Sequence, residues 1–338
     1  MTSGACPRPG PVRPEMFAIR PGPSGDARDP ARSVRGRSRS GPVRPGALAI
    51  GPGRVRDSPP DPRRAYSWDM RFVKGHGTEN DFVILPDPDG ELELSAARVA
   101  ALCDRRAGIG ADGVLRVTRT KLSPEVADQA GEAEWFMDYR NADGGVAEMC
   151  GNGTRVFARY LVESGLADEG EFGVATRAGV KRVRLARGGG DVSVDMGAPR
   201  VLGESRAVVG GREYEGVRVD MGNPHLACVI GDPVAGLDLT RQPAFDPEVF
   251  PHGVNVELLN AVGPRRVVMR VHERGVGETR SCGTGTVASA VAAARLAGET
   301  TGTWEVEVPG GTLTVTLDEH TSHLAGPAVL VASGEILI

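Results

Sequence analysis

Hydrophobic and polar positions follow the same order of patterns twice along this chain. In the first course, short apolar runs with alternating polar residues predict strands, and a helical period follows. A second helix is expected to start after Cys150 and to stop at Gly165, because glycine commonly ends helices. The predicted elements of this course lie within 70–87, 93–106 (helix), 108–119, 133–145 and 151–165 (helix).

The second course begins after a β-rich segment over 173–199, in which the glycine run at 188–190 predicts a hairpin or a domain junction. Strands are again followed by one helix, which starts after Cys282 and ends near Gly298, and then by further strands. These later strands and the helix lie within 216–230, 252–259, 265–281, 283–298, 304–317 and 326–338. A repeat of this length predicts an α+β fold of two related domains rather than a solenoid, whose repeats are shorter.

The first 69 residues have a different texture from the rest of the chain. They hold 13 of the 25 prolines, 13 arginines and 6 acidic residues, and too few apolar residues to bury a core. We therefore expect a disordered extension over 1–69, with Met70 a plausible true start, then domains over 70–188 and 189–326. Without the extension the chain carries a net charge of −11, which argues against nucleic acid as a partner.

The cysteine content bears on the compartment of the protein. Five cysteines without a CxxC pair favour neither a secreted disulfide framework nor a zinc ribbon, so reduced thiols in the cytoplasm are expected. No apolar stretch approaches the roughly 20 residues of a membrane span, and no signal-peptide core opens the sequence. Cys103 and Cys228 lie in apolar runs and are interpreted as buried core residues.

Two of the cysteines share one unusual element, "CGNGT" at Cys150 and "CGTGT" at Cys282. A cysteine just before a helix faces unpaired N–H groups and the positive end of the helix dipole, which favours the thiolate and lowers its pKa. The glycines let backbone amides approach a bound anion such as a carboxylate. Each element therefore predicts half of a site.

Two such halves meeting face to face would place one thiol on each side of a single bound molecule. Inversion of a carbon stereocentre needs this arrangement, because a base removes a proton from one face and an acid delivers one to the other. The competing interpretations are a cysteine hydrolase with His76, His225 or His272 as base, a metal site, and a binding module without turnover. The Gly-rich runs 108–113 and 283–288 match a dinucleotide fingerprint only weakly, since neither has the required strand and helix context.

At these residues the chain resembles the diaminopimelate epimerase family, whose members interconvert LL- and meso-diaminopimelate without a cofactor. The resemblance covers 70–338 and is carried, in the family's order, by "GHGTENDF", "YRNADGGVAEMCGNG", "MGNPH", "GVNVE", "ERGVGETRSCGTG" and "GPA". The chain departs from the common sequence pattern of the family at Thr78 and Glu79, where many members carry Leu-Gly, and at Gly113, where some carry a glutamine.

The resemblance implies two pseudo-symmetric domains, each a β-barrel-like sheet around a central helix, with the active site in the cleft between them. It also implies that the C-terminal strand over 327–338 joins the first domain, and that the protein forms a homodimer. The expected activity is PLP-independent epimerisation of diaminopimelate in lysine and peptidoglycan precursor biosynthesis, with no cofactor and no metal. A related two-cysteine racemase of the proline-racemase type is the alternative within the isomerases.

The resemblance also assigns roles to individual residues. Cys150 and Cys282 would be the base and the acid, with His225 and Glu273 tuning the thiols. The residues expected to bind diaminopimelate are Asn80, Asn141, Gly151, Asn152, Asn223, Asn255, Glu273, Arg274, Gly283 and Thr284. Asparagine suits this work because it donates and accepts hydrogen bonds without adding charge, and arginine can clamp a carboxylate with two parallel bonds.

Overall fold

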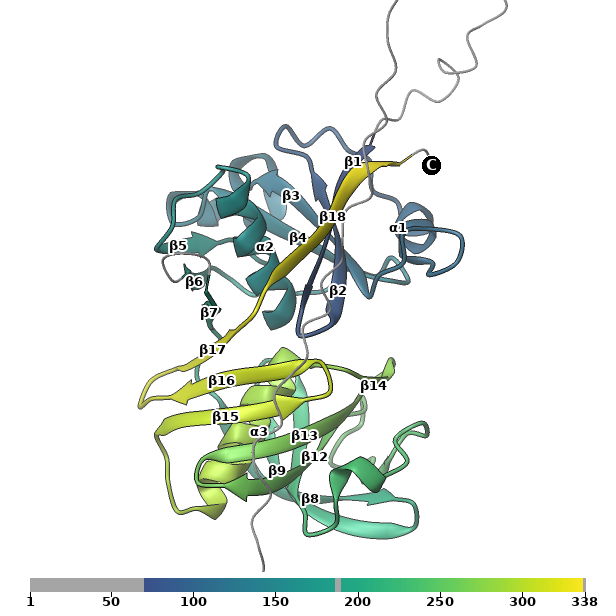
Figure 1. Ribbon diagram of the computed structural model, residues 1–338, viewed down its shortest axis with the longest axis vertical. Coiled ribbons are helices and arrows are strands. Elements are labelled where there is room, and N and C mark those ends of the chain that lie inside the picture. The colour runs from purple at the N-terminus through teal and green to yellow at the C-terminus, as the bar shows by residue number, and fades with distance from the viewer. Residues whose placement is uncertain (1–69, 186–189, 337–338) are drawn as a thin grey trace, which may run out of the picture. The chain divides into compact units, whose positions relative to one another are not determined.

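The computed structural model describes residues 70–185 and 190–336, and within them two repeated runs of strands pack around one helix each (Figure 1). The first repeat contains β1 (Met70–Gly77), β2 (Asn80–Pro86), α1 (Ala96–Cys103), β3 (Gly113–Arg119), η1 (Thr120–Leu122), η2 (Pro124–Gly131), β4 (Trp135–Asn141), α2 (Gly151–Glu163), β5 (Glu171–Val174), β6 (Lys181–Leu185) and β7 (Val192–Asp195). The predicted disorder of residues 1–69 and the glycines at 188 and 189 lie outside the described residues.

The second repeat has the same ingredients and is followed by a last strand that returns to the first. It contains β8 (Arg200–Val209), β9 (Arg212–Asp220), β10 (Pro224–Val229), η3 (Val234–Gly236), β11 (Ala244–Phe245), β12 (Asn255–Gly263), β13 (Arg266–Glu273), β14 (Gly277–Thr279), α3 (Gly283–Leu296), β15 (Gly302–Val308), β16 (Gly311–Leu317), β17 (Ser322–Gly326) and β18 (Val329–Ile336). β18 pairs antiparallel with β1 of the first repeat.

The strand order shows the pseudo-symmetry directly. The first repeat runs β18-β1-β2-β3-β4, and an isolated parallel bridge between Phe136 and Ala175 leads on to β5-β6-β7. The second runs β8-β9-β10-β12-β13-β15-β16-β17, with a parallel pair at the same two places, and β7 joins β17. The expected α+β fold of two repeated domains is therefore confirmed.

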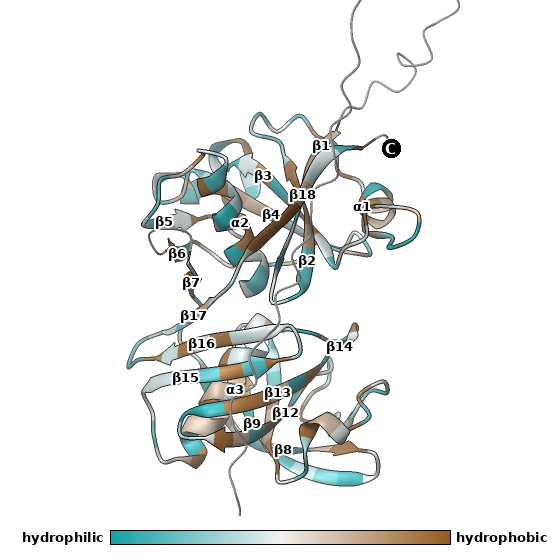
Figure 2. Cartoon of the chain, viewed as in Figure 1, coloured by the Kyte–Doolittle hydropathy of each residue, from teal (hydrophilic) through white to brown (hydrophobic). Residues whose placement is uncertain are grey.

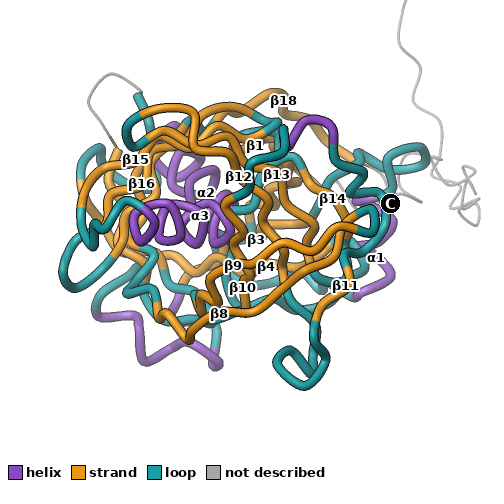
Figure 3. The backbone as a smooth tube through the Cα atoms, turned by 90° about the horizontal axis from the view of Figure 1, so that it is seen from below, coloured by secondary structure: helices purple, strands orange, loops and turns teal. Residues whose placement is uncertain are grey.

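The barrel-like form of each sheet is not fully realised. Among the described residues the strand paths remain open, because β18 pairs with β1 and not with β7, and β8 pairs with β9 and β11 and not with β17. Each sheet instead wraps around its helix, which Figure 3 shows from below with strands around α2 and α3. None of the helices in the described ranges is long and apolar enough to cross a membrane.

The two central helices differ in composition although they occupy matching places. α3 is built almost wholly from alanine, valine and small hydroxyl residues, whereas α2 carries Arg155 and Arg159, both buried. Figure 2 shows this difference as hydrophilic segments in α2 that are largely missing from α3. Both helices end as the sequence predicts, with Gly165 (φ 69°) and Gly298 (φ 74°) in the left-handed region.

The β1–β2 turn connects the first repeat to the second. Its two central residues, Thr78 and Glu79, have φ angles of 50° and 61°, which favours glycine or asparagine over these side chains. Thr78 Oγ1 lies 2.7 Å from Ser281 Oγ, and Glu79 forms an ion pair with Arg280. The strained turn is therefore held by contacts to the residues just before Cys282.

This docking predicts a large stability effect at Gly310, in the β15–β16 turn. A Cβ added there would lie 1.8 Å from the Thr78 carbonyl oxygen, so Gly310→Ala must displace the docked turn. We expect a loss of about 1–3 kcal/mol in the free energy of unfolding, measured by urea denaturation. Gly231→Ala, where an added Cβ meets nothing within 4 Å, is the control and should stay within about 0.5 kcal/mol. Equal effects of the two variants would contradict the tight docking.

Candidate active site

Two thiols occupy equivalent positions, each at the start of a central helix. Cys150 is the N-cap residue of α2 and its Sγ accepts the Gly153 amide at 3.4 Å. Cys282 is the N-cap of α3 and accepts the Gly285 amide, also at 3.4 Å. Extended backbone at both cysteines places the side chain over the first turn, where helical N–H groups lack partners.

The two helix starts abut each other. A Cβ built on Gly283 would lie 3.2 Å from Gly151 Cα and 3.3 Å from the Asn152 amide nitrogen. Glycine at both positions therefore allows the closest approach of the two N-terminal ends. The two elements that lie 132 positions apart in sequence are thus brought together by the fold.

The helix-start amides act on the thiols in the predicted direction, but the net shift of both thiol pKa values is upward, against the sequence prediction. Burial raises the pKa of Cys150 to about 11, with only partial compensation from the Gly153 and Asn152 amides. Burial, together with the nearby Glu273 and Glu257 carboxylates, raises the pKa of Cys282 well above the ordinary thiol value. Desolvation has the larger effect on these pKa values. Burial moves a pKa by as much as 3–5 units, whereas a helix end typically contributes about 0.3–1 kcal/mol, which is less than one pKa unit.

Beside the thiols, a polar side chain of the first repeat forms hydrogen bonds to a residue of the second repeat. Asn152 is fully buried, and its Nδ2 donates to Asn80 Oδ1 (3.2 Å), to the Ser281 carbonyl oxygen (3.1 Å) and to Ser281 Oγ (3.2 Å). The Cys150 thiol lies 3.6 Å from the same Asn80 oxygen. Asn80 is fixed in turn by Asp112, to which its Nδ2 donates at 2.8 Å.

On the second repeat, His225 lies between an asparagine and a carboxylate. His225 Nε2 donates to Asn223 Oδ1 at 3.0 Å, and its Nδ1 lies 2.6 Å from Glu257 Oε1. Asn223 Nδ2 reaches Thr284 Oγ1 at 3.5 Å, and that hydroxyl lies 3.5 Å from Cys282 Sγ. No hydrogen bond joins His225 to a thiol within the described residues, so its contact with Cys282 runs through Asn223 and Thr284.

The segment around Glu273 provides the remaining predicted groups. Asn255 is buried, donates to the Pro224 carbonyl oxygen at 3.1 Å and accepts the Arg274 amide at 2.9 Å. Glu273 is bonded by Thr279, and burial raises the pKa of its carboxyl, which also interacts with the Cys282 thiol. The Arg274 guanidinium is exposed, with one long bond of 3.4 Å to His252 O, which leaves it available to a ligand.

Asn141 is the predicted residue with the weakest connection to the others. It ends β4, pairs across the sheet with Gly113, and its exposed side chain has no hydrogen bond within the described ranges. Gly113 itself leaves no room for a side chain, because an added Cβ would lie 2.5 Å from the Arg140 carbonyl oxygen. The other predicted residues lie at the two helix starts or at neighbouring strand ends.

Three residues of this neighbourhood are missing from the sequence-based set, namely Glu257, Ser281 and Arg155. Glu257 is fully buried inside the apolar run "VNVELL", and an added Cβ on Gly285 would meet its Oε1 at 2.6 Å. Arg155 is fully buried on α2. A charged residue within a buried apolar pattern was the signal that could have identified the two charged ones.

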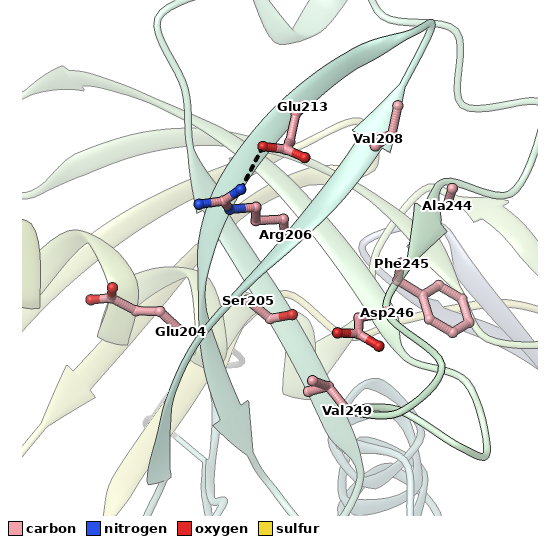
Figure 4. A pocket seen from close by; sticks show the side chains of 9 residues that line it. All are labelled: Glu204, Ser205, Arg206, Val208, Glu213, Ala244, Phe245, Asp246 and Val249. Atoms are coloured by element: carbon pink, nitrogen blue, oxygen red, sulfur yellow. Dashed lines mark hydrogen bonds and ion pairs between the residues drawn. The ribbon is translucent and has the colours of Figure 1, made fainter.

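A pocket of about 500 Å³ lies elsewhere on the second repeat, between β8, β9 and the β11 segment (Figure 4). Arg206 pairs there with Glu213 at 3.0 Å. None of the residues that line it belongs to the candidate site. They are Glu204, Ser205, Arg206, Val208, Glu213, Ala244, Phe245, Asp246 and Val249.

Known proteins resemble this chain over both repeats. The model of the family described as diaminopimelate epimerase matches residues 72–202 and 217–335. Proteins named diaminopimelate epimerase from Thermobifida fusca (strain YX) and Rhodococcus opacus (strain B4) are 58% and 56% identical over 271 and 280 residues. These alignments cover 79% of this chain and 98% and 97% of the relatives.

Solved structures share the fold at much lower identity. A PhzF-family phenazine biosynthesis protein from Bacillus anthracis matches with a TM-score of 0.58 at 18% identity, over 80% of this chain and 99% of that one. A hydroxyproline epimerase from Agrobacterium vitis, with bound trans-4-OH-L-proline, matches with a TM-score of 0.56 at 14% identity, over 81% and 94%. The paired helix starts, the repeated strand order and the similarity over nearly the whole length of the relatives lead to one conclusion: this chain belongs to the diaminopimelate epimerase family.

Proposed function

We propose that this protein is an isomerase that interconverts LL- and meso-diaminopimelate by two-base epimerisation, without a cofactor, in lysine and peptidoglycan precursor biosynthesis. The observation that carries the proposal is the contact between Gly151 and Gly283, which brings together two helix starts that are each capped by a thiol. The high identity to named diaminopimelate epimerases supports the choice of substrate.

In the proposed reaction, one thiolate removes the α-proton and the other thiol delivers a proton to the opposite face. Cys150 and Cys282 exchange these roles when the direction reverses. Afterwards the first cysteine is a thiol and the second a thiolate, so the protons balance over one turnover. The resting state is regained by proton exchange with water.

The carbanion formed in this reaction needs stabilisation, because the α-proton of an amino acid is very weakly acidic. Amides of Gly151, Asn152, Gly283 and Thr284 lie at the two helix starts and can bind the α-carboxylate. Two positive helix ends directed at one carboxylate stabilise the negative charge that develops next to it. A site shielded from water strengthens each of these interactions.

The distal amino and carboxyl groups of the substrate fit the polar groups around the site. We propose that Asn80, Asn141, Asn223 and Asn255 bind these groups, that Arg274 clamps a carboxylate, and that Glu273 and His225 act on or near the thiols. Arg274 is exposed beside the buried Asn255, which supports its assignment to a charged ligand. A ligand lacking the distal groups would leave several polar side chains unpaired, which gives selectivity.

The proposal includes three further features. Residues 70–188 together with 327–338 form the first domain and 189–326 the second, in keeping with the β18–β1 pairing. The protein acts in the cytoplasm, where thiols stay reduced as this chemistry requires. It forms a homodimer, as the family resemblance implies, and sedimentation velocity of the purified protein tests this.

Proton NMR of LL-diaminopimelate in D₂O, with reductant and without cofactor, tests the function. Deuterium entering the α position together with formation of the meso isomer would support it. Exchange on another amino acid instead would point to a different racemase. No exchange on any amino acid, with diaminopimelate still bound, would identify a binding protein on this fold.

The pH dependence of kcat/KM should follow the raised thiol pKa values. kcat/KM reports ionisations of the free protein. The fraction of Cys150 present as thiolate increases with pH up to the Cys150 pKa of about 11. The acid keeps its proton over this range, because the Cys282 pKa is also raised. We therefore expect kcat/KM to rise about three- to tenfold per pH unit from pH 7 to pH 9. A fall over this range would mean that an acid with a near-neutral pKa is required.

A further inference from the structure

The two cysteine elements differ in the charges behind them. Strand register makes Leu115 of β3 the counterpart of Glu257 of β12, since each is the third residue of its strand. The adjacent parallel strand pairs Phe82 with Gly113 and His225 with Asn255, so Phe82 corresponds to His225. The first repeat therefore has an apolar pair where the second has a buried histidine and carboxylate.

The contacts of two equivalent glycines agree with this register. An added Cβ on Gly153 would meet Leu115 Cδ2 at 3.3 Å and Phe82 Cζ at 3.5 Å. An added Cβ on Gly285 would meet Glu257 Oε1 at 2.6 Å. The side chains that support the first helical turn are thus apolar behind Cys150 and acidic behind Cys282.

A buried positive charge is present behind Cys150 and missing from the equivalent place behind Cys282. Arg155 follows Cys150 by five positions and is fully buried, and the residue five positions after Cys282 is Val287, also fully buried. The Arg155 guanidinium donates to Asn152 Oδ1 (2.6 Å), Thr78 Oγ1 (3.2 Å) and Pro327 O (2.8 Å), all of them uncharged. No ion pair of Arg155 occurs within the described residues, and its Nε has no partner.

A buried charge without a counter-charge is costly, because the desolvation penalty amounts to several kcal/mol. Burial lowers the Arg155 pKa to about 10, and the Cys150 thiolate and Asp191 act in the opposite direction. The guanidinium therefore remains charged at neutral pH. The charged or titratable groups that face Cys150 are Arg155 on its own helix, Glu273 of β13 and Tyr139 of β4, and of these only Arg155 favours the thiolate.

We propose that Arg155 is a positioning residue that supplies a positive charge behind Cys150, so that in the free protein the Cys150 thiol ionises at lower pH than the Cys282 thiol. Glu257 and Glu273 act in the opposite sense on Cys282, where a negative charge is already present. The inference deepens the proposed function, since it determines which cysteine is the base in the first turnover. An arginine on one helix and a valine at the equivalent position of the other make the two halves of the pseudo-symmetric site electrostatically different.

The test measures thiol ionisation without substrate. The full chain is alkylated with iodoacetamide over a range of pH, and modification of each cysteine is followed by peptide mass spectrometry, because only the thiolate reacts. The midpoint of each pH profile reports ionisation independently of access. We expect the Cys150 midpoint to lie below that of Cys282 in the unaltered protein, and the reverse order would overturn the proposal.

Variants separate the charge of Arg155 from its hydrogen bonds. Arg155→Gln keeps polar contacts without charge and should raise the Cys150 midpoint by about one pH unit, which is about tenfold slower alkylation at pH 8. Arg155→Lys should restore most of the shift. Arg159→Gln removes a buried arginine one helical turn further from Cys150 and should leave the midpoint unchanged.

Equal shifts of the Cys150 midpoint in the Gln and Lys variants, or no shift in Arg155→Gln, would mean that the charge of Arg155 does not act on the thiol. Either result would overturn the proposal. The acidic limb of kcat/KM should move to higher pH in Arg155→Gln by the same amount. Because alkylation needs no turnover, the outcomes are distinguishable. A protein inactive on diaminopimelate but with the expected midpoints would refute only the proposed function, and an active protein with the wrong midpoints only this inference.

Discussion

Replacing either Cys150 or Cys282 by serine is expected to lower the rate of diaminopimelate epimerisation by about 10²–10⁴-fold in both directions. Each direction uses one thiol as base and the other as acid, and a serine hydroxyl is too weak an acid to replace either. The measurement is the formation of meso from LL isomer, and of LL from meso, by each purified variant. Retention of more than about a tenth of the rate in either variant would contradict the two-base mechanism.

The two serine variants should also differ from each other. Cys282→Ser keeps the Cys150 thiolate and can still exchange the α-proton that faces it, so one epimer should incorporate deuterium from D₂O without inversion. Cys150→Ser should show the same behaviour with the other epimer. Cys103→Ala is the control, because Cys103 is the buried last residue of α1 and belongs to a core cluster that contains neither helix start. Exchange of the same epimer by both serine variants would show that the thiols do not face opposite sides of the substrate.

The local elements of this fold could be predicted from the sequence, and the long-range strand pairings could not. The two helices follow from the Cys-Gly-x-Gly-Thr runs and from the glycines at 165 and 298, all of which act within a few residues. The β18–β1 pairing joins residues more than 250 positions apart, and only the family resemblance predicted it. The β7–β17 pair, which joins β5, β6 and β7 to the sheet of the second repeat, had no signal in the sequence.

In the candidate site, the predicted residues are those with a recognisable motif, and two of the three omitted residues, Arg155 and Glu257, are buried charges. Arg155 lies in a helix whose polar residues would ordinarily face solvent, and Glu257 lies in a strand whose neighbours are apolar. The predicted net direction of the thiol pKa shift is wrong, because the sequence shows that each thiol lies at a helix start but not how deeply it is buried. The docking of Thr78 on Ser281 could not be predicted either, since it depends on the positions of both repeats.

The pair formed by His225 and Glu257 provides a test of why the second repeat carries buried charges. Its counterpart in the first repeat is Phe82 with Leu115, so the double variant His225→Phe/Glu257→Leu copies an apolar pair that already fits this position. The single Glu257→Leu change leaves His225 Nδ1 buried without its partner and should lower the free energy of unfolding by about 3 kcal/mol. The double change removes both partners and should come within about 1 kcal/mol of the unaltered protein.

Activity should not recover with stability. Without His225, Asn223 loses the donor that holds its side chain oxygen, and Thr284 beside Cys282 loses an ordered neighbour. We expect kcat/KM to fall on the order of 10²-fold in the double variant as well as in the Glu257→Leu variant. Urea denaturation and kcat/KM on the same preparations would give both quantities. A double variant that regained both stability and activity would show that the pair serves only packing. One that regained stability alone would show that the second repeat carries its buried charges for the chemistry at Cys282.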